Sequence, residues 1–386
     1  MEAWWCKHGL LIVFLGAAFV ARQSSADSPP DVPNELHASG AVEESGAQQT
    51  LTQIAWETQQ EAETESCCRG CGPLRSWLDS DPWKLPQPCM LQRLGINTGG
   101  WFQGGITMNA DDPADRFNAT VLTNDQSGQF QMNQLWLYME RPVKTDGAGV
   151  DIGGRVDMFY GTDWRVAAAQ SYHWETRFNR DDNLYGLSLP QLYGEVGIND
   201  LSVKMGHMTG ILGYEIVPPI GNFFYSHSYA LCYSEPILIT GLMGKYKLTD
   251  NWYVLGGFHR GFYMFEDWNN SLNFQGGTTW TGPEGRLSLA YALDAGRNDP
   301  ADQSQQYVHS LVAKLQLTKK LLYVLQNDLG HASNVAALGG RSAEWYGINQ
   351  YLLYTINSKW AAGARVEWFR DDDGTRVGGL GSLGFQ

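Results

Sequence analysis

Long apolar runs are scarce in this sequence. The run at residues 10–20 is too short for a membrane-spanning helix, which needs roughly 20 apolar residues, and no later segment is as continuously apolar. Charged residues make up only 18% of the chain, and the helical periodicity in Ala, Leu, Glu and Lys that is usual in a soluble enzyme of this size is missing. The formal net charge of -14 disfavours nucleic acid as a partner.

Catalytic motifs are also missing. The sequence has no Gly-x-Ser-x-Gly nucleophile elbow, no His-Glu-x-x-His and no phosphate-cradling glycine loop before a helix. The residue types that could serve outer-membrane hydrolases are present but form no motif: Ser202, His207, His227, Glu215 and Asp163. We therefore predict no enzymatic activity, no catalytic residue, no cofactor and no metal site.

The N-terminus has the pattern of a secretory signal peptide. Lys7 and His8 precede the apolar run, and small and polar residues ending at Ala26 follow it. This predicts a signal peptide over residues 1–26, with a retained N-terminal anchor as the alternative. Residues 27–66 are rich in Ser, Ala, Gln, Glu and Thr, so we expect a flexible acidic periplasmic segment there.

A cysteine cluster marks the next segment, residues 67–95. It contains Cys67, Cys68, Cys71 and Cys89. Disulfides in an oxidising periplasm and a thiolate metal site are the two alternatives. Adjacent cysteines are awkward as co-ligands and no histidine has zinc-finger spacing, so we favour disulfides among these four residues.

From Gly95 onward, apolar-polar alternation predicts strand after strand, and the connections between strands alternate in length. Short turns are expected at residues 146–147, 199–200, 249–251, 282–285, 318–320 and 357–359. Long connections are expected at residues 110–129, 161–188, 209–235, 296–306 and 331–343. Outer-membrane barrels have short periplasmic turns and long outer loops, so this sorting favours a barrel over a soluble sandwich.

Single strands predict which side chains face lipid. Between residues 150 and 160, Val156 and Met158 share a face with Val150 and Ile152, while Arg155 and Asp157 lie on the other. Between Phe130 and Met139 the apolar positions change parity, which predicts a β-bulge near Asn133 or a wrong strand boundary.

These patterns predict an all-β fold, a transmembrane antiparallel up-and-down β-barrel over residues 96–386. About 13 strands are evident and a partial one starts near Gly379, so a complete barrel would have about 14–16 and the C-terminus is expected to be truncated. Aromatic residues beside the turns predict interfacial girdles: Trp101, Trp252, Trp345, Trp360, Trp368, Tyr138, Tyr160, Tyr253 and Tyr346. A soluble β-protein with a core of aromatic residues is the alternative.

Two segments carry a resemblance to a known family. Residues 206–215 contain Gly206-His207-Met208-Thr209 and Gly213-Tyr214-Glu215, and residues 222–236 contain Asn222-Phe223-Phe224-Tyr225-Ser226 and Tyr233-Ser234-Glu235-Pro236. Together with Gly100-Trp101 and the cysteine cluster, they resemble the OmpL-like β-barrel porin family from about Cys67 to the end. The resemblance implies an outer-membrane channel and no catalytic residues.

The candidate pore-lining residues are charged side chains on predicted inner faces, together with two residues of the long connection after residue 209. They are Arg155, Asp157, Glu195, Lys204, Glu215, His227, Arg286, Asp294, Lys314, Arg365 and Glu367. Residues 210–236 are too apolar and aromatic for a solvated loop. Folding into the lumen, where they would narrow the pore, and packing over its mouth or against a neighbouring subunit remain alternatives.

The leading hypothesis is an outer-membrane porin for passive diffusion of small hydrophilic solutes or ions. Its expected partners are outer-membrane lipid and the solutes, with a homo-oligomer left open. Acidic residues on the long-loop side, such as Asp111 and Asp267, predict weak cation selectivity. The alternatives are a non-conducting surface scaffold or adhesin barrel and a soluble carbohydrate-binding protein.

Overall fold

A computed structural model gives the arrangement of the chain. It describes residues 10–19, 87–118, 121–169, 175, 179, 184–267, 269–298, 303–357 and 360–377, and for residues 10–19 the backbone alone. The predictions for residues 27–66, for Cys67, Cys68 and Cys71, and for a strand near Gly379 lie outside the described residues. Cys89, which is described, has an exposed free thiol, so its disulfide pairing stays a prediction.

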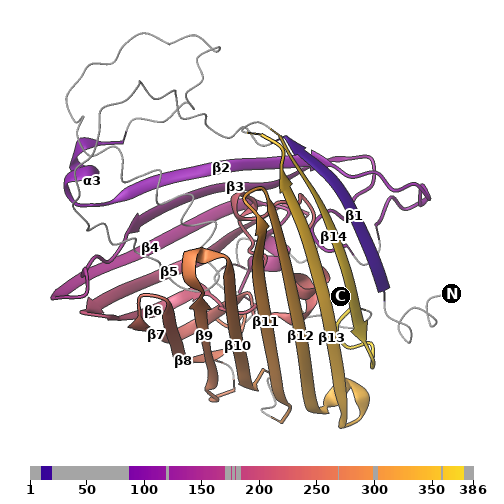
Figure 1. Cartoon of the computed structure of the whole chain (residues 1–386). Helices are drawn as coiled ribbons and strands as arrows, with labels where there is room; N and C mark the ends of the chain where they lie inside the picture. The colour runs from indigo at the N-terminus through magenta and orange to yellow at the C-terminus, as the bar shows by residue number, and fades with distance from the viewer. Residues whose placement is uncertain are drawn as a thin grey trace.

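The described chain is built almost entirely of long antiparallel strands. One 14-stranded sheet has the order β1-β14-β13-β12-β11-β10-β9-β8-β7-β6-β5-β4-β3-β2, so from β2 to β14 every strand pairs with its neighbours in sequence. Figure 1 shows this sheet curling around an interior. The strands are β1 (Leu10–Phe19), β2 (Asn97–Ile106), β3 (Phe130–Arg141), β4 (Val150–Gly161), β5 (Gly186–Ile198), β6 (Leu201–Thr209), β7 (Leu238–Thr249), β8 (Trp252–Phe262), β9 (Asn273–Thr281), β10 (Leu287–Arg297), β11 (Gln305–Thr318), β12 (Leu321–Val335), β13 (Arg341–Thr355) and β14 (Trp360–Asp371).

Helical elements are short and lie in the connections. They are α3 (Cys89–Arg93), α4 (Trp164–Ala167), the 3₁₀ turns η2 (Pro219–Gly221), η4 (Pro283–Gly285) and η5 (Ala336–Leu338), and the π-helical turn η3 (Ala230–Ser234). Among the described residues, no helix has the length and apolar character needed to cross a membrane. The all-β, up-and-down antiparallel architecture predicted from the sequence is confirmed.

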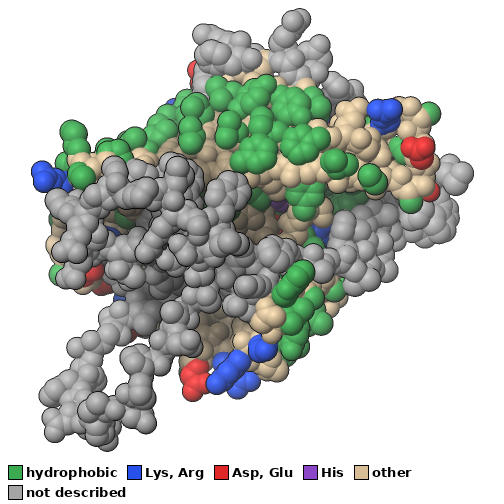
Figure 2. Space-filling model, turned by 90° about the horizontal axis from the view of Figure 1, so that it is seen from above, with side chains coloured by type: hydrophobic (Ala, Val, Ile, Leu, Met, Phe, Trp, Pro, Cys, Tyr) green, Lys and Arg blue, Asp and Glu red, His purple; other side chains and the backbone are tan. Residues whose placement is uncertain are grey.

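Alternation along each strand separates an outer apolar face from an inner polar one. On β4, Val156 is 43% exposed and Met158 is 42% exposed, while Asp157 is fully buried. The same parity holds on β14, where Arg365 and Glu367 are buried. Figure 2 shows hydrophobic side chains gathered in a broad patch on one outer face, with charged side chains at its margins. The predicted assignment of faces is therefore confirmed on these strands.

The predicted bulge on β3 is also confirmed. Gln103 of β2 pairs with Gln134, and the next residue, Gly104, pairs with Met132, so Asn133 is the extra residue. Asn133 and Gln134 are both buried, because the bulge turns two consecutive side chains toward the interior. This irregularity places two amide groups where the strand would otherwise offer one.

Two expectations about the strand ends are wrong. The long connection predicted over residues 331–343 is short, because β12 extends to Val335 and β13 begins at Arg341. The polar residues of this stretch belong to strands rather than to a loop.

The predicted interfacial girdle of aromatic residues is wrong for four of its members. Tyr138, Tyr253 and Trp345 are buried on inner faces, and the indole of Trp101 donates to the inner Gln134.

Residues 10–19, the apolar part of the predicted signal peptide, form β1 beside β14. An apolar extended run can pair with the edge of β14 and satisfy its backbone groups. Pairing in an uncleaved chain does not test cleavage, so the signal peptide stays a prediction.

Candidate pore and the segment that enters it

The long connection between β6 and β7, residues 210–237, folds into the barrel and is called the inner segment below. Its two ends are joined where the Gly210 amide donates to the Ile237 carbonyl at 2.9 Å. The side-chain oxygen of Asn222 accepts from the Ile216 amide at 3.1 Å, and the consecutive prolines Pro218 and Pro219 limit helix formation between them. The segment therefore has a defined internal fold.

The inner segment is anchored on both sides of the interior. Toward β3, Gln134 Nε2 donates to the Val217 carbonyl at 2.8 Å, and the Tyr225 hydroxyl donates to Asn133 Oδ1 at 2.5 Å. Toward β12 and β13, the Tyr214 amide donates to Gln326 Oε1 at 2.9 Å, and Trp345 Nε1 donates to Ser234 Oγ at 3.1 Å. The Ile211 amide also donates to Gln275 Oε1 of β9 at 3.1 Å, so the segment contacts strands β3, β9, β12 and β13 and lies within the interior.

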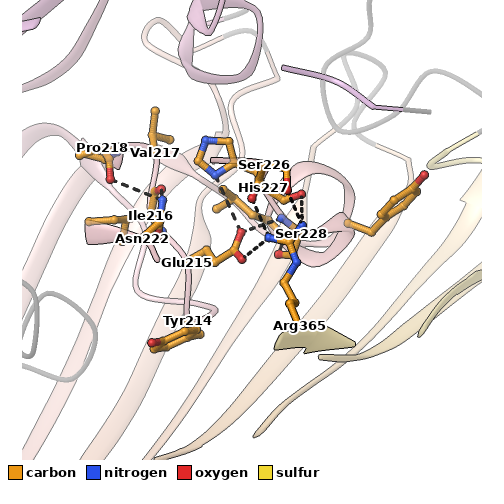
Figure 3. Close-up of polar contacts among 12 residues, drawn as sticks. Tyr214, Glu215, Ile216, Val217, Pro218, Asn222, Ser226, His227, Ser228 and Arg365 are labelled. Carbon is orange, nitrogen blue, oxygen red and sulfur yellow. Dashed lines mark hydrogen bonds and ion pairs between the residues drawn. The ribbon is translucent and has the colours of Figure 1, made fainter. Parts of the chain in front are cut away.

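A buried charge cluster fixes the segment to β14. Arg365 Nη1 lies 2.8 Å from Glu215 Oε1 and donates to the Ser226 carbonyl at 2.6 Å, while Nη2 donates to the His227 carbonyl at 3.2 Å (Figure 3). Glu367 Oε2 accepts from the Tyr229 amide at 2.8 Å. Arg365 thus binds both side-chain and backbone oxygens of the inner segment.

Glu215 compensates the charge of the buried Arg365 guanidinium. Its side chain is 4% exposed, and its carboxylate also accepts from the Tyr351 hydroxyl at 2.9 Å and from the Ser228 amide at 2.6 Å. Burial alone would raise the pKa of Glu215, but the Arg365 guanidinium and these hydrogen bonds outweigh it and lower the pKa to about 2. The residue is therefore ionised in a buried ion pair.

His227 lies in the same cluster. Its Nδ1 is 3.8 Å from Glu215 Oε2 and its side chain is buried. Glu215 and His227, which were expected to line the water path, are therefore held in the packing between the segment and the barrel wall. We call the inner face of β12–β14, with Gln326, Trp345, Tyr351, Arg365 and Glu367, the anchor wall.

The inner face of β3–β8, called the charged wall below, carries charged side chains that pair with one another within the sheet. Arg155 lies 2.6 Å from Asp157 on its own strand and 3.3 Å from Glu140 on β3. Glu195 and Lys204 are paired residues of β5 and β6. These side chains, unlike those of the anchor wall, contact residues of the strands rather than the inner segment.

Tyrosines support the cations of the charged wall. Arg155 lies 5.1 Å from the ring centroid of Tyr138, and Lys204 lies 4.7 Å from that of Tyr193. A third pair joins Lys245 of β7 to Tyr253 of β8 at 4.5 Å. Each pair spans two strands, so each of these three cations is positioned by a buried aromatic ring.

Three remaining candidates lie elsewhere. Asp294 is buried on β10, where its Oδ2 lies 2.6 Å from His259 Nε2 and accepts from Gln275 at 3.0 Å. Lys314 on β11 lies 5.5 Å from the ring of Tyr214 in the inner segment. Arg286 is exposed in the turn before β10 rather than on an inner face.

Several residues of the two walls were missed by sequence reasoning, among them Glu140, Lys245, Gln326 and Tyr351. Lys245 and Tyr351 share the parity of the buried Met243 and Asn349 on their own strands, and that signal could have found them. No group of three or more His, Cys, Asp and Glu side chains that could hold a metal ion occurs within the described residues.

An antiparallel sheet that curls with apolar side chains outside and charged ones inside has the porin fold. The chain belongs to the family described as "Putative beta-barrel porin-2, OmpL-like", whose model matches residues 95–386. The resemblance inferred from the sequence is thereby confirmed.

Solved structures of low identity also resemble the chain. A trimer form of OmpT from Vibrio cholerae has 9% identity and a TM-score of 0.37, covering 72% of this chain and 98% of that one. A mutant porin of Rh. blastica has 11% identity and a TM-score of 0.39, with 72% and 99% covered. The outer membrane channel DcaP of Acinetobacter baumannii has 11% identity and a TM-score of 0.35, with 71% and 96% covered. No match was found among the curated proteins.

Proposed function

We propose that the protein is an outer-membrane channel through which small hydrophilic solutes or ions diffuse passively. The observation that supports this most directly is the charged wall, where Glu195, Lys204 and Lys245 are only partly buried on the inner face of the barrel. Charged side chains facing inward, behind an apolar outer face, are what a water-filled lumen requires. Membership of a porin family agrees with this proposal.

The proposed path runs along the charged wall. The inner segment covers the anchor wall through Arg365 and Tyr351, and away from that wall it bonds to Asn133 and Gln134 at the bulge of β3 and to Gln275 of β9. Solutes would pass between the inner segment and the cations of β4, β6 and β7. The segment then acts as the constriction, and its size and the charges opposite it select by size and sign.

A non-conducting surface scaffold or adhesin is the second candidate. The observation that favours it is the anchoring of the inner segment on both sides of the interior, because a filled lumen would pass no ions. In that case the long outer connections would carry the function.

Conductance across planar lipid bilayers separates the two candidates. The full chain, purified and folded, should give discrete conductance steps. Lys245→Glu should shift the reversal potential in a salt gradient toward cations, because Lys245 faces the proposed path. Lys319→Glu is the matched control, since it makes the same charge change on an exposed turn residue and should have a smaller effect. A folded barrel without conductance would remove the channel proposal and favour the scaffold.

The same recordings test the predicted cation selectivity of the wild-type channel. It should fade as salt rises, because the Debye length is only about 8 Å at physiological ionic strength. Anion preference at low salt would show that Arg155, Lys204 and Lys245 outweigh the acidic loops.

A further inference from the structure

The outer face of the barrel differs between its two sides. On β3 and β4 the outward positions in the middle of the strands are apolar, and Leu137 is 60% exposed and Ile152 is 65% exposed. On β10–β13, which lie side by side in Figure 1, polar side chains interrupt the outer face. We call Tyr291, Tyr307, His309, Asn327 and Gln350 the polar patch.

The patch lies well inside the apolar band and not only at its rim. Asn327 on β12 has Leu325 and Leu329 as its neighbours on the same face, and all three point outward because they alternate with the buried Gln326 and Asp328. On β13, Gln350 is exposed between the outward Ile348 and Leu352. On β10, Tyr291 lies in the same way between Leu289 and Leu293.

The members of the patch are neighbours across strands. Ile348 pairs with Asn327 and Leu325 pairs with Gln350, so the two amides are diagonal neighbours. His309 pairs with Leu329 of β12 and with Leu293 of β10, which places it diagonal to both Asn327 and Tyr291. Diagonal neighbours are roughly 7–8 Å apart, so the patch is a continuous polar stripe across four strands.

Hydrogen bonds on the outer face of the sheet engage only some of the donors and acceptors of the polar patch. The Tyr323 hydroxyl donates to Gln350 Oε1 at 2.8 Å, and Asn327 Nδ2 donates to the Gly347 carbonyl at 3.2 Å. His309 Nδ1 lies 2.8 Å from the Tyr307 hydroxyl. Within the described chain, the amide nitrogen of Gln350, the amide oxygen of Asn327 and Nε2 of His309 form no hydrogen bond, and acyl chains offer none.

We propose that the outer face of β10–β13 binds a second copy of this chain through the polar patch. Every side chain of the patch can both donate and accept hydrogen bonds, so two copies related by a twofold axis are complementary to each other. The patch contains no Lys or Arg, so the phosphates of lipid headgroups are a poor match for it, and it lies among apolar residues where headgroups do not reach. A second copy supplies amide, imidazole and phenol groups at the same depth.

Site-specific photo-crosslinking in the outer membrane tests this surface. Two differently tagged copies of the full chain are expressed together, each with a photoreactive phenylalanine analogue in place of Gln350. An adduct carrying both tags should form on irradiation. The matched control has the analogue at Leu137, which is similarly exposed on the opposite side and should give no such adduct. No double-tagged adduct at position 350, or an adduct with lipopolysaccharide or with another protein only, would overturn the proposal.

Apolar substitution of the polar patch gives a second test. It should abolish the dimer if the patch binds a second copy, and should stabilise a monomer if the patch faces lipid. A variant combining His309→Leu, Asn327→Leu and Gln350→Leu should fold but lose the dimer in mild detergent, measured by light scattering. If the patch faced lipid, the wild-type chain would be monomeric and the variant would unfold at higher temperature than the wild type. That result, or a dimer that survives the three substitutions, would overturn the proposal.

Discussion

The anchor wall and the charged wall both carry arginine–carboxylate pairs, but they bury them to different degrees and against different partners. On the anchor wall the Arg365 and Glu215 side chains are 0% and 4% exposed, and Glu215 comes from the inner segment. On the charged wall the Arg155 side chain is 11% exposed and pairs with Glu140, which is 19% exposed, and with the fully buried Asp157 of its own strand, so all three residues belong to strands. The first pair joins two parts of the chain, whereas the second connects adjacent strands and stays close to the proposed path.

The largest effect is expected where the anchor wall is broken. Arg365→Leu would leave Glu215 and Glu367 buried together without their cation, which should cost about 3–5 kcal/mol in the free energy of unfolding. The inner segment should also detach, so single-channel conductance should rise. Urea unfolding in detergent micelles and bilayer recordings measure the two effects.

The control for this prediction is the double variant Arg365→Leu with Glu215→Leu. It removes one of the two uncompensated carboxylates, that of Glu215, so its cost should be smaller than the sum of the two single costs. Additive costs would show that the pair is not coupled, and unchanged conductance in Arg365→Leu would show that other contacts hold the segment.

A smaller effect is expected on the outer side of the charged wall. Val156→Arg places a cation on the lipid-facing side of β4 and should cost roughly 2–4 kcal/mol if that position lies near the bilayer midplane. Unfolding in lipid vesicles measures it, with Val156→Leu as the apolar control. A cost no larger than that of the control would mean that β4 does not face lipid at this depth.

The inner side of the same strand should tolerate change better than the anchor wall does. Arg155→Val leaves one fully buried carboxylate, Asp157, without its cation, whereas Arg365→Leu leaves two. Asp157 also keeps hydrogen bonds from Trp136 Nε1 at 3.0 Å and Gln191 Nε2 at 3.2 Å. We expect a cost of about 1–3 kcal/mol together with altered conductance. A cost equal to that of Arg365→Leu would remove the difference between the two walls.

Much of the fold could be predicted because each signal was local. Alternation on β4 gave the outward Val156 and the inward Asp157, and the change of parity on β3 gave the bulge at Asn133. The apolar content of residues 210–236 indicated burial. The outer end of β12 was missed because His331, Ser333 and Asn334 have loop-like composition, whereas the pairing of β12 with β13 is a tertiary contact.

The anchor wall could not be predicted in the same way. Glu215 and Arg365 are 150 positions apart, so no spacing connects them. The prediction of an interfacial girdle for Trp345 rested on its residue type and its position beside an expected loop. Its parity with the inward Ala343 was the better signal, because period-two alternation decides which face a side chain occupies.

The smallest effect expected is a pH dependence of stability that arises where the inner segment contacts the anchor wall. Glu235 is buried at the end of the inner segment, where its Oε1 accepts from Gln326 Nε2 at 2.7 Å. Burial, and then the nearby carboxylate of Asp328, raise the pKa of Glu235 well above its ordinary value of 4.5. The folded chain therefore retains a proton that the unfolded chain releases. Folding should be more favourable below about pH 4.5 and lose this advantage as the pH rises through the raised pKa.

Glu235→Gln keeps the shape of the side chain and removes its ionisation, so this part of the pH dependence should disappear and the variant should gain stability at alkaline pH. Asp250→Asn is the control, because the Lys247 ammonium at 2.8 Å lowers the pKa of Asp250 and gives a contribution of opposite sign that is lost on acidification. Unfolding midpoints in urea across pH 4 to 9 measure both. If Glu235→Gln leaves the alkaline loss of stability unchanged, then ionisation of the buried Glu235 carboxyl group does not cause that loss. The difference between the anchor wall and the charged wall would then rest on the ion pair at Arg365 alone.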